Sequence, residues 1–544
     1  MTPSPGDSQS RRRFIATSTG ALLAVACAPV SRAGRTTDDL ILRGGTVFDG
    51  TGAEGRDADV AMSDGRVTAI GRSLAQRGRT EIDVRGLAVA PGFIDIHSHG
   101  DGTLVEDPRA ESVIRQGVTT IVVGADGSSR ATGAAERSVA AYMDSIDRLQ
   151  PAVNVATMVG LGTVRGAVVG DRDRRATPDE LRQMTAMVER ALADGACGAS
   201  SGLEYTPGAF APVDELVVLC RPLAARRLPY ATHMRNEDDR LLDAIDESIA
   251  VARGAGCPLQ LSHLKTQGPR NWDKLDAVFQ RIGDARTSGV DVAFDRYPYV
   301  AYSTGLTNLF PVWSRDGGAD GFLARLADDG VAPRIRRETL AKVALIGGWD
   351  NVQVSGVRAP EDRDAEGKRL GTLAQGRGVD PYDFTVALLR RNRADVGMLG
   401  FAMSEENLER ILAHPHGMVC SDGGAFAADG PTRRGSPHPR GAGSFARVLG
   451  RYVRERKVMS LGTAIRKMTA QPAERVRLRD RGRLAVGLAA DVVVFDPSTI
   501  ADTATFASPF QYPTGIPLVI VRGEVVLRDG QRNRQGRGRA LRAV

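Results

Sequence analysis

The sequence predicts an α/β protein: a (β/α)8 TIM-type barrel with a small β-sandwich domain built from both chain ends. Two observations lead to this prediction. Residues 39–90 and 491–523 contain short alternating strands separated by Asp-Gly and Gly-Gly turns, a pattern typical of antiparallel sheets. The long stretch between them alternates apolar strands with amphipathic helices, which is typical of parallel βα units.

The middle of the chain gives the clearest examples of this alternation. In residues 179–194 apolar side chains recur at helical spacing, and Gly195 ends the predicted helix. A strand at 196–201 follows. The same order repeats in a helix at 272–286 and a strand at 290–294. An open doubly wound sheet is the alternative, but no GxGxxG motif follows a strand to support it.

The predicted domain boundaries follow these changes in pattern. We expect the barrel at residues 91–475 and the two parts of the sandwich at 34–90 and 476–544. The segment before residue 420 is long for one barrel connection, so we expect an insertion around 303–416. Such an insertion would form a lid subdomain that closes over the substrate and excludes water.

The first 33 residues are predicted to be an export signal. Ser10–Ile15 resembles a twin-arginine motif, an apolar run follows it, and Ala33 lies at a suitable cleavage position. The mature protein would then be periplasmic or extracellular. The alternative is processing at Cys27, where lipidation would anchor the protein to a membrane.

Charge and composition exclude two classes of partner. The formal charge of +7 falls to +4 without residues 1–33, because four Arg and one Asp are lost. This charge is too small and too scattered to predict nucleic-acid binding. No mature segment approaches the roughly 20 apolar residues of a membrane span. The remaining cysteines are expected to be buried free thiols: Cys197, Cys220, Cys257 and Cys420.

Four of the seven histidines mark the ends of predicted strands. His97 and His99 form an H-x-H motif, and residues two apart on a strand face the same side, so both imidazoles can bind one ion. His233, His263 and Asp422 each end another predicted strand. Barrel enzymes keep their catalytic groups at the C-terminal strand ends. The set therefore predicts a metal-dependent enzyme.

These motifs resemble the N-acyl-D-amino-acid deacylase (D-aminoacylase) family of the metal-dependent amidohydrolase superfamily. The H-x-H strand marks the superfamily, whereas the His-Leu-Lys and His-Pro-Arg segments narrow the resemblance to the deacylase branch. The resemblance covers nearly the whole mature chain and is carried by residues 90–99, 117–120, 201–205, 262–265, 297–299, 420–423, 437–440, 468–473 and 487–491.

The resemblance implies hydrolysis of an amide bond in an N-acyl-D-amino acid, with one or two zinc ions as cofactor. His97, His99 and Asp422 would hold one metal position, and His233 and His263 would hold the other. Asp422 would also be the catalytic residue, as general base and then general acid. The substrate's free carboxylate would be bound by Lys265, Tyr297, Ser303 and Arg440, and His438 would also contact the substrate.

The chain departs from the family pattern at three points. No lysine precedes His263, so a carbamylated lysine cannot bridge two metals. Asp126 stands where the family usually has a cysteine, and we predict that it is a metal ligand; the competing interpretation is a plain Asp-Gly turn. Glu204 is a weaker candidate for the bridge. Leu161 stands where the family often has a histidine, which leaves the side-chain specificity open.

The sequence alone leaves three functions open. Deacylation of N-acyl-D-amino acids is favoured. A second hydrolase function would be cleavage of a dipeptide or a cyclic amide, but the Lys265 and Arg440 cluster favours a substrate with a free carboxylate. The third is a metal-free binding protein on the same scaffold, and retention of all four strand-end histidines with Asp422 argues against it.

Overall fold

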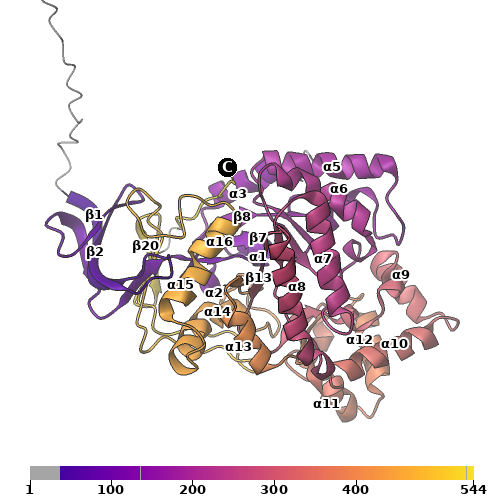
Figure 1. Cartoon of the computed structure of the whole chain (residues 1–544). Coiled ribbons are helices and arrows are strands. Elements are labelled where there is room, and N and C mark those ends of the chain that lie inside the picture. Colours follow the sequence, from indigo (N-terminus) through magenta and orange to yellow (C-terminus); the bar gives the residue numbers. More distant parts are fainter. Residues whose placement is uncertain (1–36, 135–136, 534–535, 544) are drawn as a thin grey trace, which may run out of the picture.

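A (β/α)8 barrel forms the centre of the molecule, as the sequence predicts (Figure 1). The computed structural model describes residues 37–134, 137–533 and 536–543. Two parallel sheets, β6–β7–β8 and β9–β10–β11–β12–β13–β17, make up the barrel, and β9 continues β8 after an interruption at Met158. The strands are β6 (Phe93–Asp95), β7 (Val118–Val123), β8 (Asn154–Thr157), β9 (Val159–Gly160), β10 (Ala199–Gly202), β11 (Tyr230–His233), β12 (Leu259–Leu261), β13 (Val292–Arg296) and β17 (Gly417–Val419).

The barrel closes where the chain beyond β6 meets the chain beyond β17. The backbone N–H of Asp422 donates to the carbonyl of His97 at 2.9 Å, and the N–H of His99 donates to the carbonyl of Gly423 at 2.9 Å. This seam brings together two segments that are more than 300 residues apart in sequence, as the Ser98–Gly423 hydrogen bond with its separation of 325 shows. Closure therefore places predicted site residues on adjacent chain segments.

Helices connect the strands and cover the outside of the barrel (Figure 1). Helix α5 illustrates why they form where the sequence predicts: Thr177 and Glu180 make a reciprocal capping box, and Met184 and Val188 belong to its buried face. The helices in this part of the chain are α1 (Gly100–Glu106), α2 (Glu111–Ile114), α3 (Val139–Leu149), α4 (Leu161–Val168), α5 (Pro178–Ala193), α6 (Val213–Ala224), α7 (Leu241–Ala255), α8 (Leu275–Thr287), α13 (Glu405–Ala413), α14 (Arg440–Arg447), α15 (Leu461–Met468) and α16 (Ala470–Arg475).

Strands from both chain ends join in one nine-stranded sheet beside the barrel (Figure 1). The join is antiparallel pairing of β5 with β18, which sets Ala88 opposite Phe495. The chain ends thus build one β domain, as predicted. Its strands are β1 (Thr37–Val47), β2 (Arg56–Ser63), β3 (Arg66–Gly71), β4 (Arg77–Asp83), β5 (Ala88–Pro91), β18 (Val492–Phe495), β19 (Leu518–Val521), β20 (Glu524–Arg528) and β21 (Gln531–Arg532).

A subdomain inserted between β13 and α13 lies beside the C-terminal strand ends. A three-stranded antiparallel sheet in the order β14–β16–β15 forms its base. Lys342 of the insertion donates to the carboxylate of Asp238 in the barrel at 2.5 Å, so an ion pair ties the two parts together. The insertion contains β14 (Tyr302–Gly305), β15 (Val352–Val357), β16 (Val396–Gly400), α9 (Gly318–Leu326), α10 (Ala332–Leu345), α11 (Leu370–Gly376) and α12 (Pro381–Arg391).

The described part of the chain also tests the prediction about the cysteines and shows whether any of its helices could span a membrane. Its four cysteines are buried and free, as predicted. None of its helices combines the length and the apolar character needed to cross a membrane. The predicted signal at residues 1–33, with Cys27, lies outside the described residues.

Candidate metal centre and substrate cavity

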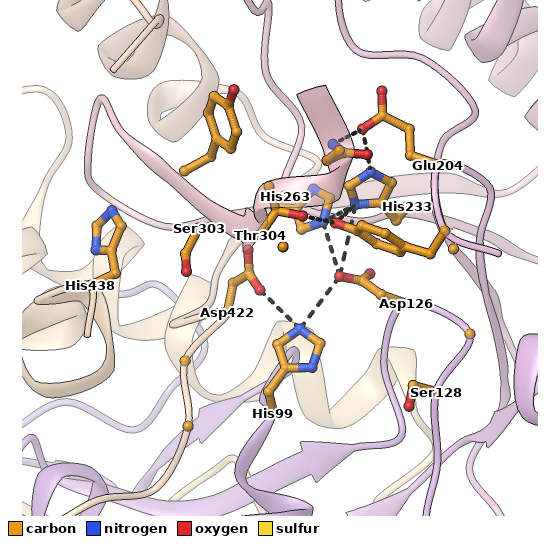
Figure 2. Close-up of a pocket in the computed structure, with 18 of the residues that line it drawn as sticks. His99, Asp126, Ser128, Glu204, His233, His263, Ser303, Thr304, Asp422 and His438 are labelled. Carbon is orange, nitrogen blue, oxygen red and sulfur yellow. Dashed lines mark hydrogen bonds and ion pairs between the residues drawn. The ribbon is translucent and has the colours of Figure 1, made fainter. Parts of the chain in front are cut away.

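The six predicted metal ligands meet at the C-terminal mouth of the barrel. Figure 2 shows five of them: His99, Asp126, His233, His263 and Asp422. They come from five strand ends: both histidines of the H-x-H motif follow β6, Asp126 follows β7, His233 ends β11, His263 follows β12 and Asp422 follows β17. Parallel strands present their C-terminal ends at the same rim of a barrel, so residues scattered in sequence converge there.

The carboxylate of Asp126 lies at the centre of this cluster. Its Oδ2 is 3.3 Å from His97 Nε2, 3.4 Å from His99 Nε2 and 3.2 Å from His263 Nε2. The Nδ1 of His233 is 3.9 Å away. One oxygen atom thus faces all four imidazoles, which a residue serving only as a turn has no reason to do.

The ligand atoms fall into two overlapping groups, in each of which they lie within 4.8 Å of one another. One group is His97, His99, Asp126 and Asp422, and the other is Asp126, His233 and His263. The division matches the two positions that the sequence predicts, with Asp126 common to both. Glu204 instead contacts the far side of His233, with Oε2 3.3 Å from Nε2. Glu204 therefore lies outside both groups and is grouped instead with His233 and Glu237.

Several of the candidate ligand atoms do not satisfy one another by hydrogen bonds, and their arrangement fits a bound cation. His97 Nε2 and Asp126 Oδ1 are buried without a hydrogen-bond partner. The ring nitrogens His233 Nδ1 and His263 Nε2 face each other at 2.9 Å. Imidazole nitrogens and carboxylate oxygens that converge on one region form the kind of ligand set that zinc takes.

Three ligands have a strained backbone. Asp126, His263 and Asp422 have φ angles of +50°, +35° and +49°, in the left-handed region that non-glycine residues rarely adopt. Such conformations cost of order 1–3 kcal/mol each and persist where the surrounding structure enforces them. Here the strain turns each side chain from its strand end into the barrel mouth.

A carboxylate lies behind each of the three most buried histidines. Asp295 Oδ1 is 3.3 Å from His97 Nδ1, and Glu237 Oε1 is 3.2 Å from His263 Nδ1. Glu204 has the same relation to His233. Carboxylates in this position fix the tautomer and orientation of metal-binding histidines. Sequence reasoning missed Asp295 and Glu237, although Asp295 carries a signal because it lies near the end of β13.

The carboxylates of the cluster favour the protonated form of its imidazoles when no metal ion neutralises them. Burial disfavours the charged imidazole of His99, but hydrogen bonds to Asp126 and Asp422 outweigh burial and raise its pKa to about 9. Burial alone would raise the pKa of Asp422, yet Arg440, His263 and His97 together lower it. A metal ion would displace those protons from the imidazoles.

A cavity of about 820 Å³ opens beside the metal ligands. Residues of the insertion, including Ser303, Asn308 and Ser355, form part of its wall. All five residues expected to bind the substrate line it: Lys265, Tyr297, Ser303, His438 and Arg440.

Two of these five are already paired with protein carboxylates. Arg440 Nη1 lies 2.6 Å from Asp422 Oδ2, and the guanidinium stacks over the Tyr297 ring at 4.5 Å. Lys265 Nζ lies 2.6 Å from Glu237 Oε1. The hydroxyl of Tyr297 is buried and has no partner in the described structure. Positive charge and an unsatisfied hydroxyl thus meet at one end of the cavity.

The structure corrects the expected role of His438. Its Nε2 donates to the carbonyl of Ala301 at 2.9 Å, and its Nδ1 accepts from the backbone N–H of Arg440 at 3.0 Å. Burial, followed by Arg440, lowers the pKa of His438 well below its ordinary value. Both ring nitrogens are therefore used, so His438 orients the loop that carries Arg440 and has no free nitrogen for a substrate.

The chain belongs to the amidohydrolase family, in its N-acyl-D-amino-acid deacylase branch. The model of the amidohydrolase family matches residues 80–309 and 424–527. An N-acyl-D-glutamate deacylase of Alcaligenes xylosoxydans xylosoxydans is 38% identical over 501 residues, which cover 89% of this chain and 93% of the relative. A D-aminoacylase of the same organism is 36% identical over 520 residues, covering 92% and 97%.

A solved structure shows the same architecture. The N-acyl-D-glutamate deacylase of Bordetella bronchiseptica, in complex with zinc and a phosphonate inhibitor that mimics the tetrahedral intermediate, matches with a TM-score of 0.80. It is 37% identical, and the match covers 93% of this chain and 100% of that one. The likeness therefore extends over both the barrel and the β domain.

Proposed function

We propose that this protein hydrolyses the amide bond of N-acyl-D-amino acids in a zinc-dependent reaction, releasing a carboxylate and a D-amino acid. The observation that carries the proposal is the convergence of four histidines and Asp422 on Asp126 at the mouth of the barrel. The cationic end of the adjoining cavity adds a site for a free carboxylate. The N-acyl-D-glutamate deacylase and the D-aminoacylase named above align with 89% and 92% of this chain.

The metal would be held by His97, His99 and Asp422 at one position and by His233 and His263 at the other, with Asp126 common to both. Zinc at this site supplies a Lewis acid for the scissile carbonyl and lowers the pKa of a water molecule.

Asp422 is placed to move the protons of the reaction. Its Oδ1 is 3.1 Å from His99 Nε2, and Arg440 holds its other oxygen. An ionised carboxylate at this position accepts the proton of the attacking water and then delivers it to the nitrogen of the leaving amine. The same residue thus acts first as base and then as acid.

The cavity wall supplies the groups that orient the substrate. A guanidinium has five N–H donors and an ammonium three, so Arg440 and Lys265 can bind a substrate carboxylate while they keep their protein partners. The unpartnered hydroxyl of Tyr297 offers a further donor, and Ser303 lies on the same cavity wall. A substrate without a free carboxylate leaves these groups unused.

A substrate panel combined with metal analysis tests the proposal. Purified protein is assayed against N-acetyl-D- and N-acetyl-L-amino acids with acidic, apolar and basic side chains, together with hydantoin and dihydrouracil. We expect release of the D-amino acid, loss of activity after chelation, and recovery with zinc. Turnover of the cyclic amides alone, or activity that survives complete metal removal, would contradict the proposal.

We further propose that residues 1–33 direct export by the twin-arginine route, on the strength of the Arg11-Arg12 pair and the apolar run that follows. Replacing both arginines by lysine should leave the unprocessed protein in the cytoplasm. The mass of the mature protein distinguishes cleavage after Ala33 from lipidation at Cys27. Export of the double-lysine variant at the normal level would contradict the twin-arginine route.

A further inference from the structure

Glu237 lies where the metal centre meets the carboxylate-binding end of the cavity. Its Oε1 is 2.6 Å from Lys265 Nζ and 3.2 Å from His263 Nδ1. Lys265 Nζ also lies 2.6 Å from that same histidine nitrogen. All three side chains are at most 3% exposed, and all three line the cavity.

Glu237 differs from the other carboxylates behind the histidines. Asp295 accepts from Gln260 and from the backbone of His263, and Glu204 accepts from Asn308. Within the described residues, neither forms an ion pair with a lysine or arginine. Glu237 is therefore the one carboxylate of the three that also holds a cation of the substrate cavity.

The tautomer of His263 decides what the three groups can do together. If Nε2 is a metal ligand, the ring proton resides on Nδ1, which must then donate and cannot accept a hydrogen bond from Lys265. Glu237 has two oxygens and can accept from both neighbours. The Nδ1–H and the ammonium would then share one carboxylate, and the other donors of Lys265 would be available to the cavity.

We infer that Glu237 is a positioning residue that orients His263 toward zinc and Lys265 toward the substrate carboxylate, and so couples metal binding to substrate recognition. The part of this inference that concerns Lys265 and the substrate rests on the proposed function. The part that concerns His263 and zinc does not depend on which substrate is hydrolysed.

The local structure holds Glu237 firmly enough for this role. It lies in the β11–α7 loop, four residues after His233, and its carbonyl accepts from the N–H of Gln267 at 2.8 Å.

The test compares zinc release and substrate binding in Glu237→Gln and Lys265→Met. Zinc-loaded protein is mixed with excess chelator, and the release of zinc is followed with a metal indicator. Residues that hold a ligand histidine typically contribute about 10- to 100-fold in metal affinity or activity, so we expect release from Glu237→Gln to be at least about 10-fold faster. Its KM for an N-acetyl-D-amino acid should rise more than its KM for the corresponding amide.

Lys265→Met should reproduce the change in KM without the faster zinc release, because it leaves Glu237 on His263. Asp238→Asn is the matched control in the same loop, since Asp238 binds a lysine but no histidine, and its zinc release should stay within twofold of wild type. Zinc release from Glu237→Gln at the wild-type rate would overturn the inference. Zinc release that is equally fast in Lys265→Met or Asp238→Asn would overturn it as well. The effect would then come from the loss of a charge or from the packing of the loop.

Two further measurements keep the test decisive. If circular dichroism shows that Glu237→Gln does not fold, Glu237→Asp takes its place, because the shorter side chain keeps the charge but cannot reach both partners. If the wild type hydrolyses nothing on the substrate panel, the proposed function fails. The zinc-release comparison still decides whether Glu237 orients His263.

Discussion

Asp126→Asn tests whether one carboxylate serves both metal positions. The φ angle of +50° at residue 126 would strain most side chains, but asparagine tolerates the left-handed region as aspartate does. The amide also has nearly the same shape as the carboxylate. The variant therefore removes the charge and the strong ligand while it leaves the turn intact, which Asp126→Ala would not do.

The two ligand groups set the size of the expected effect. The first group retains His97, His99 and Asp422 without Asp126, and three protein ligands are the number that catalytic zinc sites use. The second group retains only His233 and His263. We therefore expect wild-type protein to bind more than one zinc per chain and Asp126→Asn to lose about one equivalent. A fall of at least about 100-fold in affinity at the second position corresponds to about 2.7 kcal/mol.

The assay is zinc content by mass spectrometry after desalting, measured beside thermal unfolding to show that the variant folds. Asp126→Cys provides the matched gain-of-ligand control, because thiolate binds zinc, and should keep at least one equivalent. Unchanged zinc content together with unchanged activity in Asp126→Asn would refute the reasoning. Asp126 would then be only a turn residue, and the site would consist of the histidines and Asp422.

Three other predictions address catalysis, recognition and stability. Asp422→Asn should lower kcat by at least about 100-fold, as lost general catalysis predicts; near-wild-type kcat would remove Asp422 from the mechanism. Arg440→Ala should raise KM for N-acyl-amino acids much more than for their amides, and equal losses on both would leave Arg440 a structural role. Burial, followed by His416 and Lys467, lowers the pKa of His414 to about 4. The unfolded chain therefore takes up a proton there first, and the free energy of unfolding falls as the pH drops from about 6.5 to about 4. His414→Gln should weaken this pH dependence, which urea titrations at a series of pH values measure. The prediction is contradicted if the free energy of unfolding changes with pH as steeply in the variant as in the wild type.

The candidate ligands can be picked out from the sequence because each lies at or just after the end of a recognisable strand. An apolar strand followed by His or Asp is a local pattern, and a parallel barrel converts that pattern into a common location. His97, His233 and Asp422 are found in this way without any knowledge of distances. Asp126 is found by its place after an apolar strand and a glycine, and the structure puts its carboxylate between the histidine pairs.

The partners behind the ligands are harder to predict because they depend on loop conformation. Glu237 follows His233 by four residues in a loop, and nothing local shows that the loop folds back onto His263. The family resemblance implies that His438 contacts the substrate, but its two ring nitrogens are satisfied by the carbonyl of the distant Ala301 and by the backbone N–H of Arg440. Hydrogen-bond satisfaction of this kind is a tertiary property.

The seam of the barrel passes through the candidate metal centre. His97 and Asp422 lie on the two chain segments that meet at barrel closure, and their backbones are hydrogen bonded to each other at 2.9 Å. At the other end of β6, the N–H of Gly92 donates to the carbonyl of Asp491 at 2.8 Å, so the β domain fastens the first barrel strand to the C-terminal part of the chain. A cation shared by His97 and Asp422 would favour the closed barrel over the unfolded chain, by about 2.7 kcal/mol at a free concentration 100 times its Kd. Because the first ligand pair and Asp422 are separated by most of the barrel, metal binding at this position requires that the intervening strands are already in register.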